Sequence, residues 1–77
     1  MATYKVHIKK NGYKTTYSTN DTTLATTIYR PDLDKYDLCS PSVGQLVNTR
    51  EEADSAARES ITAFFATVGL VPDFVND

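Results

Sequence analysis

The segment from Thr49 to Gly69 constrains this chain most, because it carries the start, the apolar stripe and the end of one helix. Thr49 and Glu52 have the Thr-x-x-Glu spacing of a capping box, in which each side chain binds a backbone N–H that the helix leaves unpaired. Gly69 suits a left-handed cap, and Pro72 prevents continuation of the helix. We therefore expect a helix over about 50–68.

One face of this expected helix is apolar, because its apolar residues recur at steps of three and four. The stripe consists of Ala53, Ala56, Ala57, Ile61, Phe64 and Val68. A single amphipathic helix cannot bury such a stripe by itself, so the rest of the chain must supply a sheet. Phe65 lies one step off the stripe, and the pattern leaves its burial undecided.

Strand signals fill the first thirty residues and predict strands over about 3–10, 13–19 and 23–30. Apolar and polar residues alternate in the first of these, which is the pattern of a half-buried strand. Asn11 and Gly12 follow it as a strong hairpin signal for a type I′ turn. Such a turn places Ile8 opposite Thr15 and Lys9 opposite Lys14. The like-charged lysine pair would also discourage pairing of this hairpin with other chains.

The rest of the chain is less regular. Residues 32–42 are polar and rich in turn formers, 43–47 is a candidate for a short fourth strand, and 70–77 is a tail that covers a sheet edge or a partner. The expected fold is therefore α+β, with an antiparallel three- to four-stranded β-meander packed against one C-terminal α-helix. All of it forms one small domain over residues 1–77.

Cysteine usage and hydropathy restrict the class of protein. Cys39 is the single cysteine, so it forms no internal disulfide, and His7 is the single histidine, so a zinc site lacks ligands. A lone cysteine is typical of a reducing compartment. No apolar run approaches the ~20 residues of a membrane-spanning helix, and the N-terminus lacks the apolar stretch of a signal peptide. We expect a cytoplasmic protein with no membrane contact, in the host cell if a phage encodes it.

Most chemical motifs are absent from the sequence. The three glycines are scattered, which excludes a glycine-rich phosphate loop, and one histidine provides no Ser-His-acid set. Asp32, Asp34 and Asp37 crowd one segment. However, Lys35 lies among them, and the central glycine and closing glutamate of a calcium loop are missing. We therefore expect no enzymatic activity, no cofactor and no metal.

Charge is distributed unevenly between the two parts of the chain. Residues 1–20 carry a net charge of +4 and residues 21–77 carry −6, which together give −2. One interpretation is ordinary solvated surface, and the other is an acidic region that docks on a basic protein partner. For the second, the candidate partner-binding residues are Asp32, Asp34, Tyr36, Asp37, Glu51, Glu52 and Asp54. Tyr36 would be the buried anchor of that interface.

Two other functions remain open at this point. One is weak nucleic-acid binding through the lysines of the first hairpin, which are Lys5, Lys9, Lys10 and Lys14. The net acidic charge makes nucleic acid an unlikely main partner. The other is a homo-oligomeric structural or accessory protein, a homodimer for instance, in which an edge strand or the tail pairs between subunits.

Several segments resemble one known family. Residues 49–53 (TREEA) and 57–61 (ARESI) look like the helix of the small β-β-β-α domain of HicB-type antitoxins, with its Thr-x-Glu-Glu-Ala and Ala-Arg-Glu-x-Ile motifs. Residues 4–8 (YKVHI), 12–13 (GY) and 31–33 (PDL) are also similar to that domain. The resemblance covers about half of the chain and implies an antitoxin that covers the active surface of a small basic ribonuclease.

The chain is also similar in size and charge to small phage inhibitors of host defence, anti-CRISPR proteins among them. The prediction from both likenesses is a non-enzymatic, protein-binding inhibitor of a basic nuclease or nucleoprotein, of the kind that a phage or mobile element carries.

Overall fold

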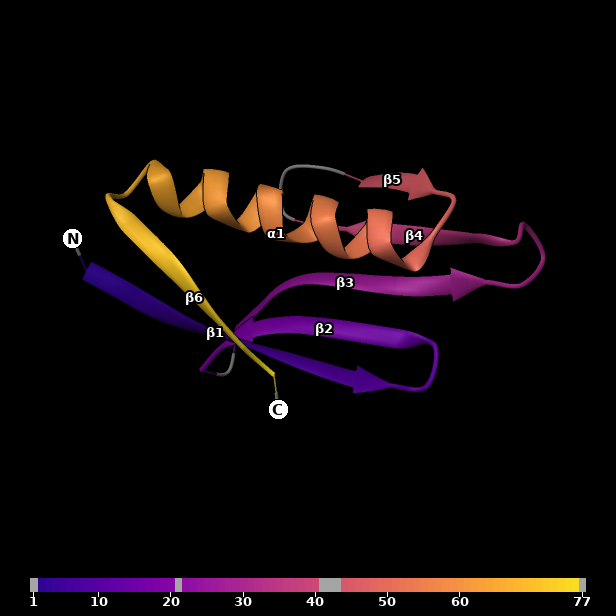
Figure 1. Cartoon of the computed structure of the whole chain (residues 1–77), viewed down its shortest axis with the longest axis horizontal. Coiled ribbons are helices and arrows are strands. Elements are labelled where there is room, and N and C mark those ends of the chain that lie inside the picture. Colours follow the sequence, from indigo (N-terminus) through magenta and orange to yellow (C-terminus); the bar gives the residue numbers. More distant parts are fainter. Residues whose placement is uncertain (1, 21, 41–43, 77) are drawn as a thin grey trace.

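The computed structural model describes residues 2–20, 22–40 and 44–76, which form one sheet and one helix (Figure 1). The strands are β1 (Ala2–Asn11), β2 (Lys14–Thr19), β3 (Thr22–Arg30), β4 (Lys35–Cys39), β5 (Gly44–Val47) and β6 (Leu70–Asn76), and the helix is α1 (Arg50–Ala66). The sheet order is β5-β4-β3-β2-β1-β6. The α+β class is confirmed. The sheet has six strands of mixed direction, however, instead of three or four antiparallel ones.

Strands β1 to β5 form an antiparallel meander in chain order, and α1 then returns the chain across one face of the sheet to the start of β6 (Figure 1). Strand β6 pairs parallel with β1, with Val6 beside Phe74. The tail expected over 70–77 therefore covers a sheet edge, as one of its two alternatives predicted, and it does so as a strand over 70–76. Asp77 lies outside the described residues. Pro72 and Asp73 hid this strand, because both residue types are rare in strands except at a sheet edge.

The expectation of a polar, turn-rich segment over 32–42 is wrong for 35–39, which form strand β4, and residues 41 and 42 lie outside the described residues. Only a short turn separates β3 from β4, and Asp34 completes it with a φ of 53°. Within β4, Leu38 is buried while the residues on either side of it are more exposed. Polar residues outnumber apolar ones in this segment, which masked the alternation. The predicted short strand over 43–47 is present as β5, and Val43 lies outside the described residues.

The register of the first hairpin differs from the expected one by two residues. Ile8 lies opposite Tyr17, and Lys9 lies opposite Thr16, so the expected contact between two lysines does not form. The turn residues are Gly12 and Tyr13, and of these only Gly12 has a positive φ, of 62°. Glycine at the first central position of a two-residue turn is typical of type II′, which competes with the type I′ turn that Asn-Gly favours. A shift of two keeps every side chain on its expected face.

Helix α1 begins as expected, at a capping box. The Thr49 hydroxyl accepts a hydrogen bond from the Glu52 N–H at 3.1 Å, and the Glu52 carboxylate accepts one from the Asn48 N–H at 3.4 Å. The helix ends at Ala66, two residues before the expected end, and Gly69 takes the left-handed conformation with a φ of 75°. None of the described helices is long and apolar enough to cross a membrane.

The buried face of α1 is rotated from the expected stripe. Its buried residues are Ala53, Ala57, Ile61 and Phe65, which follow a strict spacing of four. Phe65 is 5 % exposed and packs edge-on against Tyr4, with ring centroids 5.9 Å apart. Phe64 and Val68 are 49 % and 60 % exposed, so their expected place in the core is wrong. Leu70 and Phe74 of β6 pack against the same core cluster as this face of the helix.

We predict that Phe65→Ala and Phe64→Ala differ in their effect on stability. Phe65→Ala should lower the free energy of unfolding by about 3 kcal/mol or more, because it leaves a cavity in the core. Phe64→Ala should cost less than about 1 kcal/mol, because about half of that ring is already in water. Urea denaturation followed by circular dichroism measures both values, and equal losses would contradict this assignment of the core.

Candidate protein-binding surface

Three tyrosines from neighbouring parts of the sheet touch one another and form what we call the tyrosine row: Tyr13, Tyr29 and Tyr36. The ring centroids of Tyr13 and Tyr29 are 5.6 Å apart, and those of Tyr29 and Tyr36 are 5.0 Å apart. The strand register explains the contact, because Tyr29 pairs with Tyr36 and its N–H donates to the Tyr13 carbonyl at 3.1 Å. Aromatic pairs at these distances stabilise each other beyond the area they bury.

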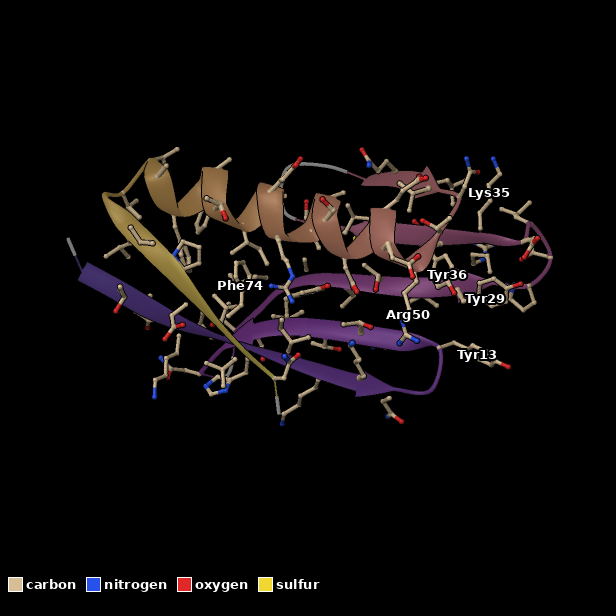
Figure 2. All side chains as sticks on the ribbon, in the orientation of Figure 1. Tyr13, Tyr29, Lys35, Tyr36, Arg50 and Phe74 are labelled. Atoms are coloured by element: carbon tan, nitrogen blue, oxygen red, sulfur yellow. The ribbon has the colours of Figure 1, made fainter. Side chains whose placement is uncertain are left out.

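The tyrosine row lies on the helix-side face of the sheet, at an end that α1 leaves uncovered. Tyr29 and Tyr36 are two residues from the buried pair Thr27 and Leu38, so the alternation of strands puts them on that face. Figure 2 shows the three rings beyond Arg50, the first residue of α1. Tyr13 is 73 % exposed, and the other two rings are half-buried. The row therefore offers aromatic surface that the domain itself does not use.

A hydrogen bond holds the middle ring of the row in place. The Tyr29 hydroxyl donates to Asp34 Oδ1 at 2.7 Å, across the turn between β3 and β4. This bond raises the pKa of Tyr29, and desolvation adds to the rise. The bond orients Tyr29, and it links the predicted acidic residue Asp34 directly to the row.

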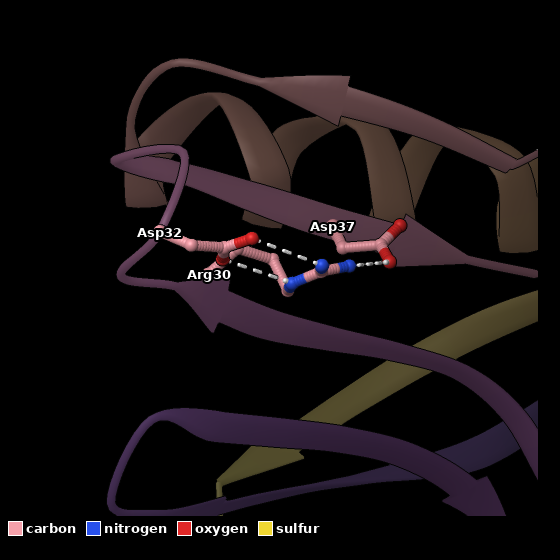
Figure 3. Close-up of polar contacts among 3 residues, drawn as sticks. All are labelled: Arg30, Asp32 and Asp37. Carbon is pink, nitrogen blue, oxygen red and sulfur yellow. Dashed lines mark hydrogen bonds and ion pairs between the residues drawn. The ribbon is translucent and has the colours of Figure 1, made fainter.

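Arg30 gathers two of the predicted acidic residues on the opposite side of the same strands. Its guanidinium donates to both carboxylate oxygens of Asp32 at 3.3 Å, and it approaches Asp37 at 3.8 Å (Figure 3). All three side chains are about half exposed, so water screens these pairs and they contribute little stability. Their three charges sum to −1, which leaves this turn mildly acidic.

The predicted acids of the helix start are mostly used within the domain. Glu52 belongs to the capping box, and Asp54 Oδ1 accepts a hydrogen bond of 2.6 Å from the hydroxyl of Tyr17, whose side chain is fully buried. Glu51 is exposed. The structure therefore brings Asp32, Asp34, Tyr36 and Asp37 together around one turn, whereas Glu52 and Asp54 have structural partners. A role of any of these residues in binding stays a prediction.

The sequence predicted Tyr36 as an interface anchor in the acidic segment, but it did not link this residue to Tyr13 and Tyr29. The three residues are far apart in the chain, and their contact depends on the pairing of β3 with both β2 and β4. With β4 interpreted as a loop, no cross-strand pair linked Tyr29 to Tyr36. The only signal available in the sequence was the unusual number of tyrosines, five in 77 residues.

The four lysines proposed for nucleic-acid binding do not form one patch. Lys5, Lys9 and Lys14 lie on the face of the sheet opposite the helix, whereas Lys10 pairs with the buried Thr15 and so lies on the helix side. Lys5 also lies beside Asp73 of β6. Nucleic-acid binding through these lysines stays a prediction, because a phosphate backbone needs a concentrated cationic surface and only three of the four share a face.

Over the described ranges, no three histidine, cysteine, aspartate or glutamate side chains come together as a metal site. Cys39 is an exposed free thiol. Comparisons of the chain with family models, curated proteins and solved structures find no match. The resemblance to HicB-type antitoxins therefore stays a prediction.

We predict that Tyr17→Phe changes the stability of the domain in a pH-dependent way. Burial raises the pKa of Tyr17, and the hydrogen bond to Asp54 raises it further, so folding favours the neutral phenol. The resulting stabilisation is complete below the unfolded pKa of about 10 and is lost as the pH rises above that value. Wild type should exceed Tyr17→Phe by about 1 kcal/mol at neutral pH, and the difference should shrink at alkaline pH.

Urea denaturation of both proteins at neutral and alkaline pH measures this difference. Tyr29→Phe is the matched control, because its hydroxyl also bonds an aspartate but lies at the exposed end of the sheet. It should leave the neutral-pH midpoint nearly unchanged. A Tyr17→Phe difference that is constant with pH would contradict the assigned role of the Tyr17 hydroxyl.

Proposed function

We propose that this domain is a non-enzymatic, protein-binding inhibitor that neutralises a basic nuclease or nucleoprotein by covering part of its surface. The observation that carries the proposal is the tyrosine row, with three mutually contacting aromatic rings at an uncovered end of the sheet. The acidic turn between β3 and β4 borders this row. The proposal includes the antitoxin-like or phage anti-defence type of inhibitor and a cytoplasmic site of action.

Tyrosine is suited to such a surface because it buries a large area on binding and has few rotatable bonds to immobilise. Interface residues whose loss costs most are enriched in tyrosine, tryptophan and arginine. In this domain the rings support one another, and the bond from Tyr29 to Asp34 fixes the middle ring before any partner arrives. A preorganised surface loses less conformational entropy on association.

A basic partner is proposed because Asp34 and Glu51 lie at this end of the domain and Asp32 and Asp37 lie on the other face of the same strands. Exposed Lys35 and Arg50 lie at the same end, so acidic and basic side chains both border the row. Exposed charges of this kind act mainly on the association rate and on the choice of partner. The rings of the row stand on the open face of a sheet. Small-molecule sites are concave, so a surface of this kind is better suited to contact with another protein.

We predict that two substitutions in the row abolish capture of the partner. The tagged domain with Tyr13→Ser and Tyr36→Ser should lose a basic protein that wild type retains from nuclease-treated bacterial lysate at moderate salt. The expected loss of affinity is at least about tenfold, because both substitutions remove aromatic anchors. Tyr29 is kept, so the bond to Asp34 and the fold of the turn remain.

The matched control carries Val68→Ser and Val71→Ser, which remove exposed apolar side chains after α1 and on β6, away from the row and the acidic turn. It should retain the same protein as wild type. A further variant, Asp34→Asn with Asp37→Asn, tests the charge of the partner and should weaken binding most at low salt. Equal capture by the row variant and wild type, or binding that improves in the amide variant, would contradict the proposal.

A further inference from the structure

The face of the sheet opposite α1 is open, because α1 is the single helix of the described residues and covers the other face (Figure 1). Strands β1, β2 and β3 contain no aspartate or glutamate, and three of their lysines lie on this open face: Lys5, Lys9 and Lys14. All three lysines are exposed, and none of them forms an ion pair with another described residue. Within the described part of the domain, no contact neutralises these charges.

The three lysines form a line along β1, with His7 between the first two. Residues two apart on a strand share a face and repeat at about 6.8 Å, so Lys5, His7 and Lys9 follow one another at that spacing. Lys14 pairs with Asn11 and lies diagonally to Lys9, with Cα atoms about 7–8 Å apart, so it extends the line by one more step. We call these four residues the basic strip, and it is about 20 Å long.

A hollow of about 240 Å³ lies beside the middle of the basic strip and is lined by polar side chains, those of His7, Lys9, Ser18 and Asn20. Ser18 pairs with His7 in the strand register, so its hydroxyl lies on the open face next to the strip. The amide nitrogen of Asn20 donates to the Tyr4 hydroxyl at 3.0 Å, which holds the Asn20 side chain in place. Hydroxyl, amide and ammonium groups all bind phosphate oxygens in complexes of proteins with nucleic acids.

We propose that the open face binds the phosphodiester backbone of a nucleic acid, with one phosphate in the hollow and neighbouring phosphates along the basic strip. Phosphate charges repeat regularly along a nucleic-acid strand, as the basic side chains do along β1. The strip contains no aromatic ring on which a base could stack, so binding should not depend on base sequence. Asp73 lies beside Lys5 and weakens that end of the strip, so Lys9 and Lys14 carry most of the contact.

Fluorescence anisotropy with a labelled, mixed-sequence single-stranded DNA tests the proposal. We expect a Kd on the order of 100 µM near physiological salt, because three lysines displace few counterions from the DNA. Each lysine contact contributes about 0.7 to the fall of log affinity with log salt concentration for a single strand, so the slope should be about −2. The affinity should therefore fall roughly twentyfold between about 50 and 200 mM salt.

Two double variants locate the contact on the domain. Lys9→Gln with Lys14→Gln should lower the affinity at low salt by at least about tenfold and reduce the slope to about −0.7, because one lysine of the strip remains. The matched control, Lys10→Gln with Arg50→Gln, removes the same charge from the helix side and should lower the affinity much less. All four side chains are exposed, so neither variant should disturb the fold.

Four outcomes would overturn the proposal: no binding of the DNA at low salt, an affinity independent of salt, equal losses in the two variants, or tighter binding to poly-glutamate or phosphatidylserine vesicles than to the DNA. The contact goes beyond the proposed inhibitor function and does not depend on it, because the tyrosine row lies on the other face of the sheet. The Lys9 and Lys14 substitutions leave the row intact, so capture of a protein partner by this variant tests the two proposals separately.

Discussion

The crossover formed by β5, α1 and β6 is the constraint on which the rest of this structure depends. A parallel pair cannot be closed by a hairpin and needs a long connection, usually a helix. Helix α1 has 17 residues and so a length of about 26 Å. The seven residues of β6 span about 23 Å, which is close to the length of the helix. The helix therefore carries the chain back far enough for β6 to run alongside β1. Strand β1 thereby becomes internal, and Val6 and Ile8 are almost fully buried.

The same crossover explains where surface is left over for binding. One helix covers only part of one sheet face, so the end of the sheet beyond Arg50 and the β5 edge stay uncovered. Tyr17 marks the border between the two regions, because its ring is buried while its hydroxyl reaches Asp54 on α1. Beyond it, the helix-side face changes from aliphatic core to tyrosine row. The row is a continuation of the core face that lacks a helix above it.

Interactions between residues close in the sequence made the helix and the first strands predictable. The remaining strands depend on pairing between segments that are far apart in the chain. The capping box and Gly69 predicted the helix, because hydrogen bonds within a few residues determine its ends. Strands β4 and β6 were missed because Asp37 interrupts the first, and Pro72 and Asp73 the second, with residue types that are rare in strands. For the site, the acidic turn was predictable from composition. The row was not, because its three rings meet only through the registers of β2, β3 and β4.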